Sequence, residues 1–391
     1  MTNKLLHTPE GVRDVYNSEC LRKTSLENRL LKLFQKFGYH PIQTPTFEFF
    51  DIFGSDVGTT PSKDLYKFFD REGNTLVLRP DITPSIARAV SKYFGGQPVV
   101  RLSYAGNVFI NNNSYQGRLK ESTQLGAECI GEGSLESDGE IIAMVVNSLK
   151  EAGLKEFQIS IGHAGLFQGL MESVDFSDEE KDQVKHLIMN KNSFGLQEIL
   201  QKRNVDADLL HVFASLNAMF IDPKEWQDLL SSARPYSKVY EALSYLSELY
   251  EVLNIYGVSK YVSFELGLLT THKYYTGIIF QGYTFGSGEP IVKGGRYDRL
   301  MAYFNQDAPA IGFAIELDQL LISLERQGLS EEVSSSVETV YYSKENRTKA
   351  IQYANARRES GFDVELILLK SETELESKRE ENSNETVTMF L

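Results

Sequence analysis

Long apolar segments are absent from this sequence of 391 residues. A helix that spans a membrane needs about 20 consecutive apolar residues, and no stretch approaches that length. The N-terminal residues 1–14 contain neither the apolar stretch nor the small-residue cleavage site of a signal peptide. From these absences we expect a protein of the cytoplasm that has no membrane partner.

Cysteine is scarce, and histidine lacks metal-binding spacing. The two cysteines, Cys20 and Cys129, cannot form a disulfide framework, and no CxxC pair suggests a zinc site. The six histidines include no HxH or HExxH pattern. GxGxxG and GxxxxGK(S/T) segments are also missing, which excludes the usual glycine-rich loops for dinucleotides and phosphates. We therefore expect no metal and no cofactor.

Positive charge is in deficit, because 40 lysines and arginines oppose 54 aspartates and glutamates for a net charge of −14. A dedicated nucleic-acid-binding protein usually carries a basic patch. The composition therefore argues against nucleic acid as a partner. The hydrophobic fraction of 41% and the charged fraction of 24% are ordinary for a globular protein, and the length suggests about two to three domains.

Periodicity and turn residues predict a mixed α+β chain. An apolar stripe predicts a helix over 20–37, and another helix is expected over 138–152. Strand-like segments lie at 75–81 and 157–162, and the pattern of 99–131 predicts two strands joined by a polar loop. These elements favour an α+β fold over a parallel Rossmann sheet. We expect an antiparallel sheet flanked by helices, which we place on one side of it.

The sequence changes character over residues 166–256, where helical patterns follow one another. Ser177 and Glu180 have the spacing of a helix-capping box. We interpret this segment as a helical insertion. Strand-like sequence returns after it, and GGRYDRL (294–300) is interpreted as a turn, with a phosphate contact by Arg296 as the less favoured alternative.

Three segments make up the predicted domain organisation. Residues 1–329 form the main domain, which includes the helical insertion, and residues 330–336 (SEEVSSS) form a linker. Residues 337–391 contain a small β-α-β piece followed by a polar tail. We expect this tail to be loosely ordered, because it has few apolar residues with which to form a core.

Five segments in a fixed order make the chain similar to class II aminoacyl-tRNA synthetases, specifically the histidyl enzymes. GYHPIQTPTFE (38–48) resembles motif 1, the dimer-forming element of that family. LVLRPDITPSIAR (76–88) resembles its strand that contacts the amino acid, and residues 101–131 resemble its motif 2 region. YYTGIIF (274–280) resembles the histidine-specific segment, and 294–320 resembles motif 3. The resemblance implies a class II synthetase-like fold and self-association as a dimer.

Three arginines of that family hold the phosphate of ATP and stabilise the charge that develops on it. Planar guanidinium groups suit this task because they bind phosphate through two hydrogen bonds. The matching positions in this chain are Ile110, Thr270 and Gln319. Losing one such cation commonly costs on the order of a few kcal/mol of transition-state stabilisation. The resemblance therefore implies that the catalytic positions are lost.

The amino-acid pocket of the family, by contrast, is matched. The carboxyl groups of Asp81 and Glu128 suit an ammonium group, and the amide of Gln124 suits an uncharged ring nitrogen. Taken alone, Gln124 and Glu128 would more simply belong to a surface strand face, and Tyr274 and Tyr275 would more simply be packed aromatic rings. Together they imply a pocket for a histidine-like ligand, formed by Asp81, Thr83, Arg118, Gln124, Glu128, Tyr274 and Tyr275.

A histidyl-tRNA-synthetase-like chain without these arginines is similar to the regulatory subunits of ATP phosphoribosyltransferase. That resemblance implies no enzymatic activity of its own, and a complex with a short-form catalytic subunit in the first step of histidine biosynthesis. It also implies L-histidine as a feedback effector. The residues after the linker are too few for a full anticodon-binding domain, so they resemble a remnant of one.

Two alternatives remain at this stage. The first is a divergent but active histidyl-tRNA synthetase or amino-acid ligase, which the missing arginines disfavour. The second is a module that senses amino acids or uncharged tRNA, which would need a basic face.

Overall fold

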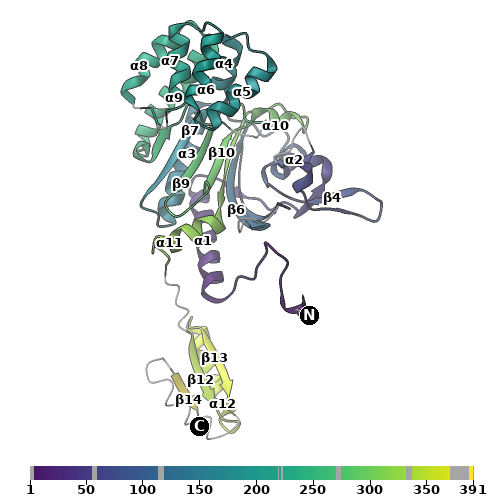
Figure 1. Cartoon of the computed structure of the whole chain (residues 1–391). Coiled ribbons are helices and arrows are strands. Elements are labelled where there is room, and N and C mark those ends of the chain that lie inside the picture. Colours follow the sequence, from purple (N-terminus) through teal and green to yellow (C-terminus); the bar gives the residue numbers. More distant parts are fainter. Residues whose placement is uncertain are drawn as a thin grey trace. The chain divides into compact units, whose positions relative to one another are not determined.

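The computed structural model describes residues 4–54, 60–112, 119–218, 220–221, 223–269, 274–331, 337–369 and 387–390. The chain divides into two compact units (Figure 1). The larger one consists of Met1–Val15 and Lys23–Ser330, and the smaller one consists of Tyr16–Arg22 and Glu331–Leu391.

An eight-stranded mixed sheet, in the order β1-β5-β6-β11-β10-β9-β7-β8, forms the centre of the larger unit. The interior neighbours are antiparallel, whereas β1 pairs with β5 and β7 pairs with β8 in parallel. The expected antiparallel sheet is therefore confirmed in its interior and wrong at its two edges. The strands are β1 (His40–Pro41), β5 (Val100–Phe109), β6 (Glu121–Ile130), β7 (Phe157–His163), β8 (Val262–Phe264), β9 (Ile278–Thr284), β10 (Val292–Arg296) and β11 (Ala310–Glu316).

Helices cover both faces of this sheet, so their placement on one side is wrong. Buried residues of α1 and α3 share one apolar cluster with Leu125 and Ala127 of β6. Buried residues of α2 and α10 share a second cluster with Leu102 and Tyr104 of β5. Apolar side chains on both faces of the strands must all be covered, and one layer of helices covers only one face. These helices are α1 (Asn17–Lys36), α2 (Thr83–Tyr93), α3 (Leu135–Glu151) and α10 (Asp298–Ala302).

The segment interpreted as a helical insertion contains α4 to α9, seen in teal in Figure 1. Ser177 and Glu180 form the predicted capping box at the start of α5. The Trp226 ring packs edge-on against Phe264 of β8, with ring centroids 5.3 Å apart, and this contact joins the helices to the sheet. The helices are α4 (Ala164–Ser173), α5 (Asp178–Met189), α6 (Ser193–Lys202), α7 (Ala207–Ser215), α8 (Trp226–Ala233) and α9 (Ser237–Ile255).

A small antiparallel sheet of order β2-β4-β3 lies in the N-terminal third of the chain. It consists of β2 (Phe47–Phe49), β3 (Lys67–Phe69) and β4 (Thr75–Leu78). Arg79, directly after β4, is buried and donates hydrogen bonds to the carbonyl oxygens of Asn107 at 2.8 Å and Thr44 at 2.9 Å. These bonds fix the chain between β4 and α2 against β5.

The GGR segment does not form the predicted turn. Gly294, Gly295 and Arg296 lie in β10, between β9 and β11. A Cβ atom at Gly294 would lie 2.3 Å from the Phe280 ring, so glycine here permits a close approach within the sheet. The helix α10 follows β10, and the helix α11 (Leu317–Arg326) follows β11.

The smaller unit contains a parallel sheet of order β13-β12-β14 and the helix α12 (Arg347–Glu359). The first three elements match the predicted β-α-β piece: β12 (Glu338–Tyr342), α12 and β13 (Val364–Leu368). The expectation of a loose tail is wrong for Val387–Phe390, which form β14. The tail residues 370–386, and residues 332–336 of the expected linker, lie outside the described residues.

Candidate functional site

A cavity of about 190 Å³ opens on the face of the large sheet that α2 covers. Six of the seven predicted site residues line it, and the seventh, Arg118, lies outside the described residues. The lining residues are Thr60, Pro80, Asp81, Thr83, Ile110, Gln124, Glu128, Tyr274, Tyr275, Lys293, Gly294, Tyr297, Gly312, Phe313, Ala314 and Glu316.

Strand register explains why distant residues meet in this cavity. Gln124 and Glu128 are four residues apart on β6, so their side chains project from the same face. Their partners on β11 are Glu316 and Gly312, respectively. Lys293 on β10 pairs with Ala314, which lies between these two on the same face of β11. The pocket floor is thus one face of three adjacent strands.

Glu128 occupies the most enclosed part of the pocket, with a side chain that is 1% exposed. The Thr83 hydroxyl donates a hydrogen bond of 2.7 Å to its Oε1 atom, and the Tyr297 hydroxyl donates to its Oε2 atom. A Cβ atom at Gly312 would lie 1.6 Å from Oε2, so the carboxyl group fits only because this position is glycine. The structure therefore holds Glu128 in one position before any ligand binds.

Burial raises the pKa of the Glu128 carboxyl group to about 8, although the hydrogen bonds from Tyr297 and Thr83 oppose this shift. The nearby Asp81 carboxylate raises it further, because two like charges repel each other. The group is consequently largely protonated at neutral pH in the empty pocket. A cation placed beside it would favour the ionised form.

Aromatic rings form one wall of the pocket. The Tyr274 and Tyr275 rings lie 4.7 Å apart, and the Tyr297 ring meets Tyr274 edge-on at 6.0 Å. Burial raises the pKa of all three phenols above its usual value, so their hydroxyl groups stay protonated. A wall of this kind fits a flat ring whose edge carries hydrogen-bonding groups.

Two charged residues of the pocket, Glu316 and Lys293, were missed by the sequence analysis. Gln124 donates a hydrogen bond from Nε2 to Oε1 of Glu316 at 2.9 Å. Burial raises the pKa of Glu316, and the positive charge of Lys293 opposes the shift. The Gln124 Oε1 atom is buried and accepts no hydrogen bond within the described part of the chain. It is therefore available to a donor on a ligand.

The structure describes two of the three positions that the resemblance matches to the phosphate-binding arginines. Ile110 lines the pocket with an apolar side chain, Gln319 lies on α11 and is not among the lining residues, and Thr270 falls outside the described residues. Three carboxyl groups and one lysine are the charged groups of the described lining. This excess of acidic groups favours the binding of a cationic group and disfavours the binding of a polyphosphate.

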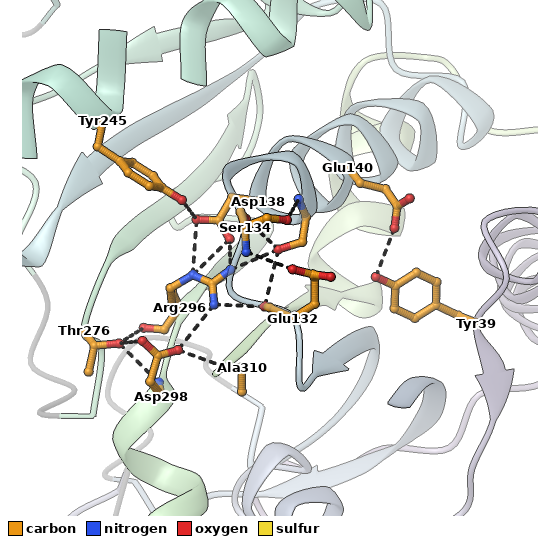
Figure 2. Close-up of polar contacts among 11 residues, drawn as sticks. Tyr39, Glu132, Ser134, Asp138, Glu140, Tyr245, Thr276, Arg296, Asp298 and Ala310 are labelled. Atoms are coloured by element: carbon orange, nitrogen blue, oxygen red, sulfur yellow. Dashed lines mark hydrogen bonds and ion pairs between the residues drawn. The ribbon is translucent and has the colours of Figure 1, made fainter. Parts of the chain in front are cut away.

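The guanidinium group of Arg296 is buried and makes internal contacts with neighbouring side chains (Figure 2). Its guanidinium group pairs with Asp138 of α3, which also accepts a hydrogen bond of 2.7 Å from the Tyr245 hydroxyl of α9. Asp298 accepts hydrogen bonds from Arg296 and, at 3.0 Å, from the Thr276 hydroxyl. We name Asp138, Tyr245, Thr276, Arg296 and Asp298 the arginine cluster. It anchors the chain directly after Tyr275.

Neither a metal centre nor a membrane helix is found in the described parts of the chain. No group of three or more potential ligand side chains there could hold a metal ion. No helix there is long and apolar enough to cross a bilayer.

Known proteins resemble this chain along nearly its whole length. The family model for histidyl-tRNA synthetases matches residues 11–320. The ATP phosphoribosyltransferase regulatory subunit of Ruminiclostridium cellulolyticum is 40% identical over 94% of this chain and 88% of that protein. The regulatory subunit of Clostridium kluyveri is 37% identical over 96% of both chains.

Solved structures agree with these sequence relatives. An ATP phosphoribosyltransferase regulatory subunit/histidyl-tRNA synthetase from Bacillus halodurans C has a TM-score of 0.84 and 32% identity, with 98% of each chain covered. A histidyl-tRNA synthetase from Nostoc has a TM-score of 0.78 over 96% of this chain and 89% of that one, and at 18% identity it shows the shared fold alone. This chain belongs to the family of ATP phosphoribosyltransferase regulatory subunits, which has the class II histidyl-tRNA synthetase fold.

Proposed function

We propose that this chain is a regulatory subunit of ATP phosphoribosyltransferase that catalyses no reaction itself. In this role it binds a separate short-form catalytic subunit and transmits feedback inhibition by L-histidine to it. The observation that carries the proposal is a pocket with pre-positioned amino-acid contacts and no arginine among its described lining residues. An acidic pocket of this kind can bind the ammonium group of an amino acid, but it has few positive charges that could bind a triphosphate.

Histidine fits this pocket with its ring at the enclosed end. Glu128 lies there beside Tyr274 and Tyr297, and a carboxyl group in an aromatic enclosure suits the N–H group of an imidazole. Asp81 and the free Oε1 atom of Gln124 then suit the α-ammonium group. This arrangement exchanges the roles that the sequence alone suggests for Glu128 and Gln124, because the structure encloses Glu128 more completely.

We expect no histidine-dependent pyrophosphate exchange and no charging of tRNA by the purified chain. Ile110 and Gln319 offer no cation to the α-phosphate of ATP, so the adenylate would form without the charge stabilisation that the synthetases use. The measurement is isotope exchange between pyrophosphate and ATP, with an active histidyl-tRNA synthetase as the positive control. Exchange that increases in proportion to the concentration of this chain would contradict the proposal.

We also propose that the chain self-associates through the segment 38–48 and the small sheet that contains its end. The side chains of Phe47 and Phe49 project from one face of β2 and are 52% and 56% exposed. Phe68 of β3 lies on the same face, with its ring 5.7 Å from that of Phe47. An exposed aromatic face of this kind favours association with a second apolar surface.

The variant Phe47→Ser/Phe49→Ser is expected to weaken this dimer by more than about tenfold, because each buried aromatic side chain contributes about 1.5–3 kcal/mol. Sedimentation equilibrium of the full chain measures the effect. The matched control is Phe69→Ser, since Phe69 is exposed on the opposite face of the same sheet. Unchanged association in the double variant would place the dimer contact elsewhere.

A further inference from the structure

Lys293 is the single cation among the described residues that line the pocket. It lies on β10, and its cross-strand partner on β11 is Ala314. Glu316 lies two residues further along β11, on the same face of the sheet. Diagonal neighbours in an antiparallel pair are about 7–8 Å apart between Cα atoms, which is within the reach of a lysine side chain.

Glu316 connects this lysine to the predicted amino-acid contacts. It accepts a hydrogen bond from Gln124 Nε2 at 2.9 Å, and the positive charge of Lys293 acts on its carboxyl group. The amide of Gln124 is thereby oriented with its Oε1 atom free. Glu316 thus accepts a hydrogen bond from an amide and experiences the charge of a cation at one side of the pocket.

A free amino acid brings a carboxylate into this pocket as well as an ammonium group. Asp81, Glu128 and Glu316 would repel that carboxylate, since like charges raise each other's energy in a partly buried site. Histidine can therefore be accommodated only if its carboxylate meets a positive charge. Among the described lining residues, Lys293 alone can supply it.

We propose that Lys293 receives the α-carboxylate of the ligand and that Glu316 positions Lys293 for this contact. The pocket then selects a complete amino acid and rejects the corresponding amine, which has the same ring and ammonium group without the carboxylate. This inference rests on the proposed function, because it concerns the same histidine pocket.

The test compares two probes, L-histidine and histamine, by calorimetric titration of the full-length chain. The unaltered protein is expected to bind histidine at least about tenfold more tightly than histamine, because one charge-assisted contact is worth about 10- to 100-fold in affinity. The variant Lys293→Met is expected to weaken histidine binding by a similar factor and to change histamine binding by less than about twofold.

Two further variants separate recognition from a structural effect. Lys293→Arg retains the positive charge and is expected to restore most of the preference for histidine. Glu316→Gln keeps an acceptor for Gln124 and removes the charge that positions Lys293, so the preference for histidine over histamine is expected to fall. The matched control is Lys155→Met, because Lys155 is an exposed lysine outside this pocket.

Equal weakening of both ligands by Lys293→Met would overturn the inference, because it would show a structural role for the lysine. Unchanged histidine binding in this variant would overturn it as well. If the unaltered chain binds neither probe, the histidine pocket itself is refuted, and the inference falls with it.

Discussion

The variant Glu128→Ala is expected to raise the histidine concentration needed for half-maximal inhibition of the reconstituted complex by well over tenfold. Removing a charged partner from a buried ligand group costs on the order of 2–4 kcal/mol. Glu128 is the most enclosed acid of the pocket and is already held by Thr83 and Tyr297. Gln124→Ala should act in the same direction with a smaller effect, since its amide is neutral.

The measurement is inhibition of phosphoribosyl transfer by histidine in the complex with the short-form catalytic subunit. Assembly of that complex, followed by size-exclusion chromatography with light scattering, should be unaffected by either variant. Glu151→Ala is the matched control, because Glu151 is an exposed glutamate at the end of α3. If both pocket variants were inhibited like the unaltered complex, the effector would have to bind elsewhere, for example between the two subunits.

Histidine binding is expected to be tightest between pH 6.5 and 8, and to weaken about tenfold per pH unit on either side. The enclosed Glu128 carboxyl group has a pKa of about 8 in the empty pocket. The imidazole ring of free histidine has a pKa of about 6.5. In the proposed complex, the ring and the carboxyl group share one proton.

The number of protons on the free ligand and the empty pocket sets the direction of each limb. Below the pKa of the ring, ligand and pocket together carry two protons, so one must leave on binding and the affinity rises with pH. Between the two pKa values they carry one, and the affinity is constant. Above the pKa of Glu128 they carry none, so binding takes up a proton and the affinity falls as the pH rises.

Calorimetric titration in buffers of different ionisation enthalpy measures both the affinity and the proton exchange. The variant Glu128→Gln removes the group that titrates on the alkaline side, so the alkaline limb should disappear, whereas the acid limb, which the imidazole ring of the ligand sets, should remain. A profile that keeps its alkaline limb in this variant would assign the limb to a group other than Glu128.

Local signals in the sequence were sufficient for most elements of the fold. The strands around 99–131, the helix before Gly38 and the capping box at Ser177 depend on residues close together in the chain, and each is found as expected. The second layer of helices was missed, because coverage of a strand face depends on packing between residues far apart in sequence. The strand β14 was missed for the same reason, since it forms only by pairing with β12.

The pocket residues also differ in whether the sequence reveals them. Asp81, Gln124 and Glu128 were identified through motif resemblance, and the structure brings them to one cavity. Glu316 and Lys293 were missed, because their contribution depends on the register between β10, β11 and β6. No spacing along the chain reveals a register between strands that are joined by more than a short turn.

The GGR segment was misinterpreted because two adjacent glycines usually indicate a turn. Here Gly294 and Gly295 lie inside the sheet, where the rings of Phe280 and Tyr275 occupy the space that side chains would need. The buried arginine that follows, Arg296, pairs with Asp138, which is 158 residues away in the sequence. Its role could not be deduced from the residues around it.

The arginine cluster also bears on the thermodynamics of ligand binding in the pocket. By anchoring the chain directly after Tyr275, it orders one wall of the pocket during folding, so little conformational entropy is lost when a ligand arrives. The same contacts connect this wall to α3 and, through Tyr245, to α9 of the helical insertion. A ligand shifts a conformational equilibrium only by the difference between its affinities for the two states. For the pocket wall that is ordered beforehand, that difference has to come from changes in contact distance.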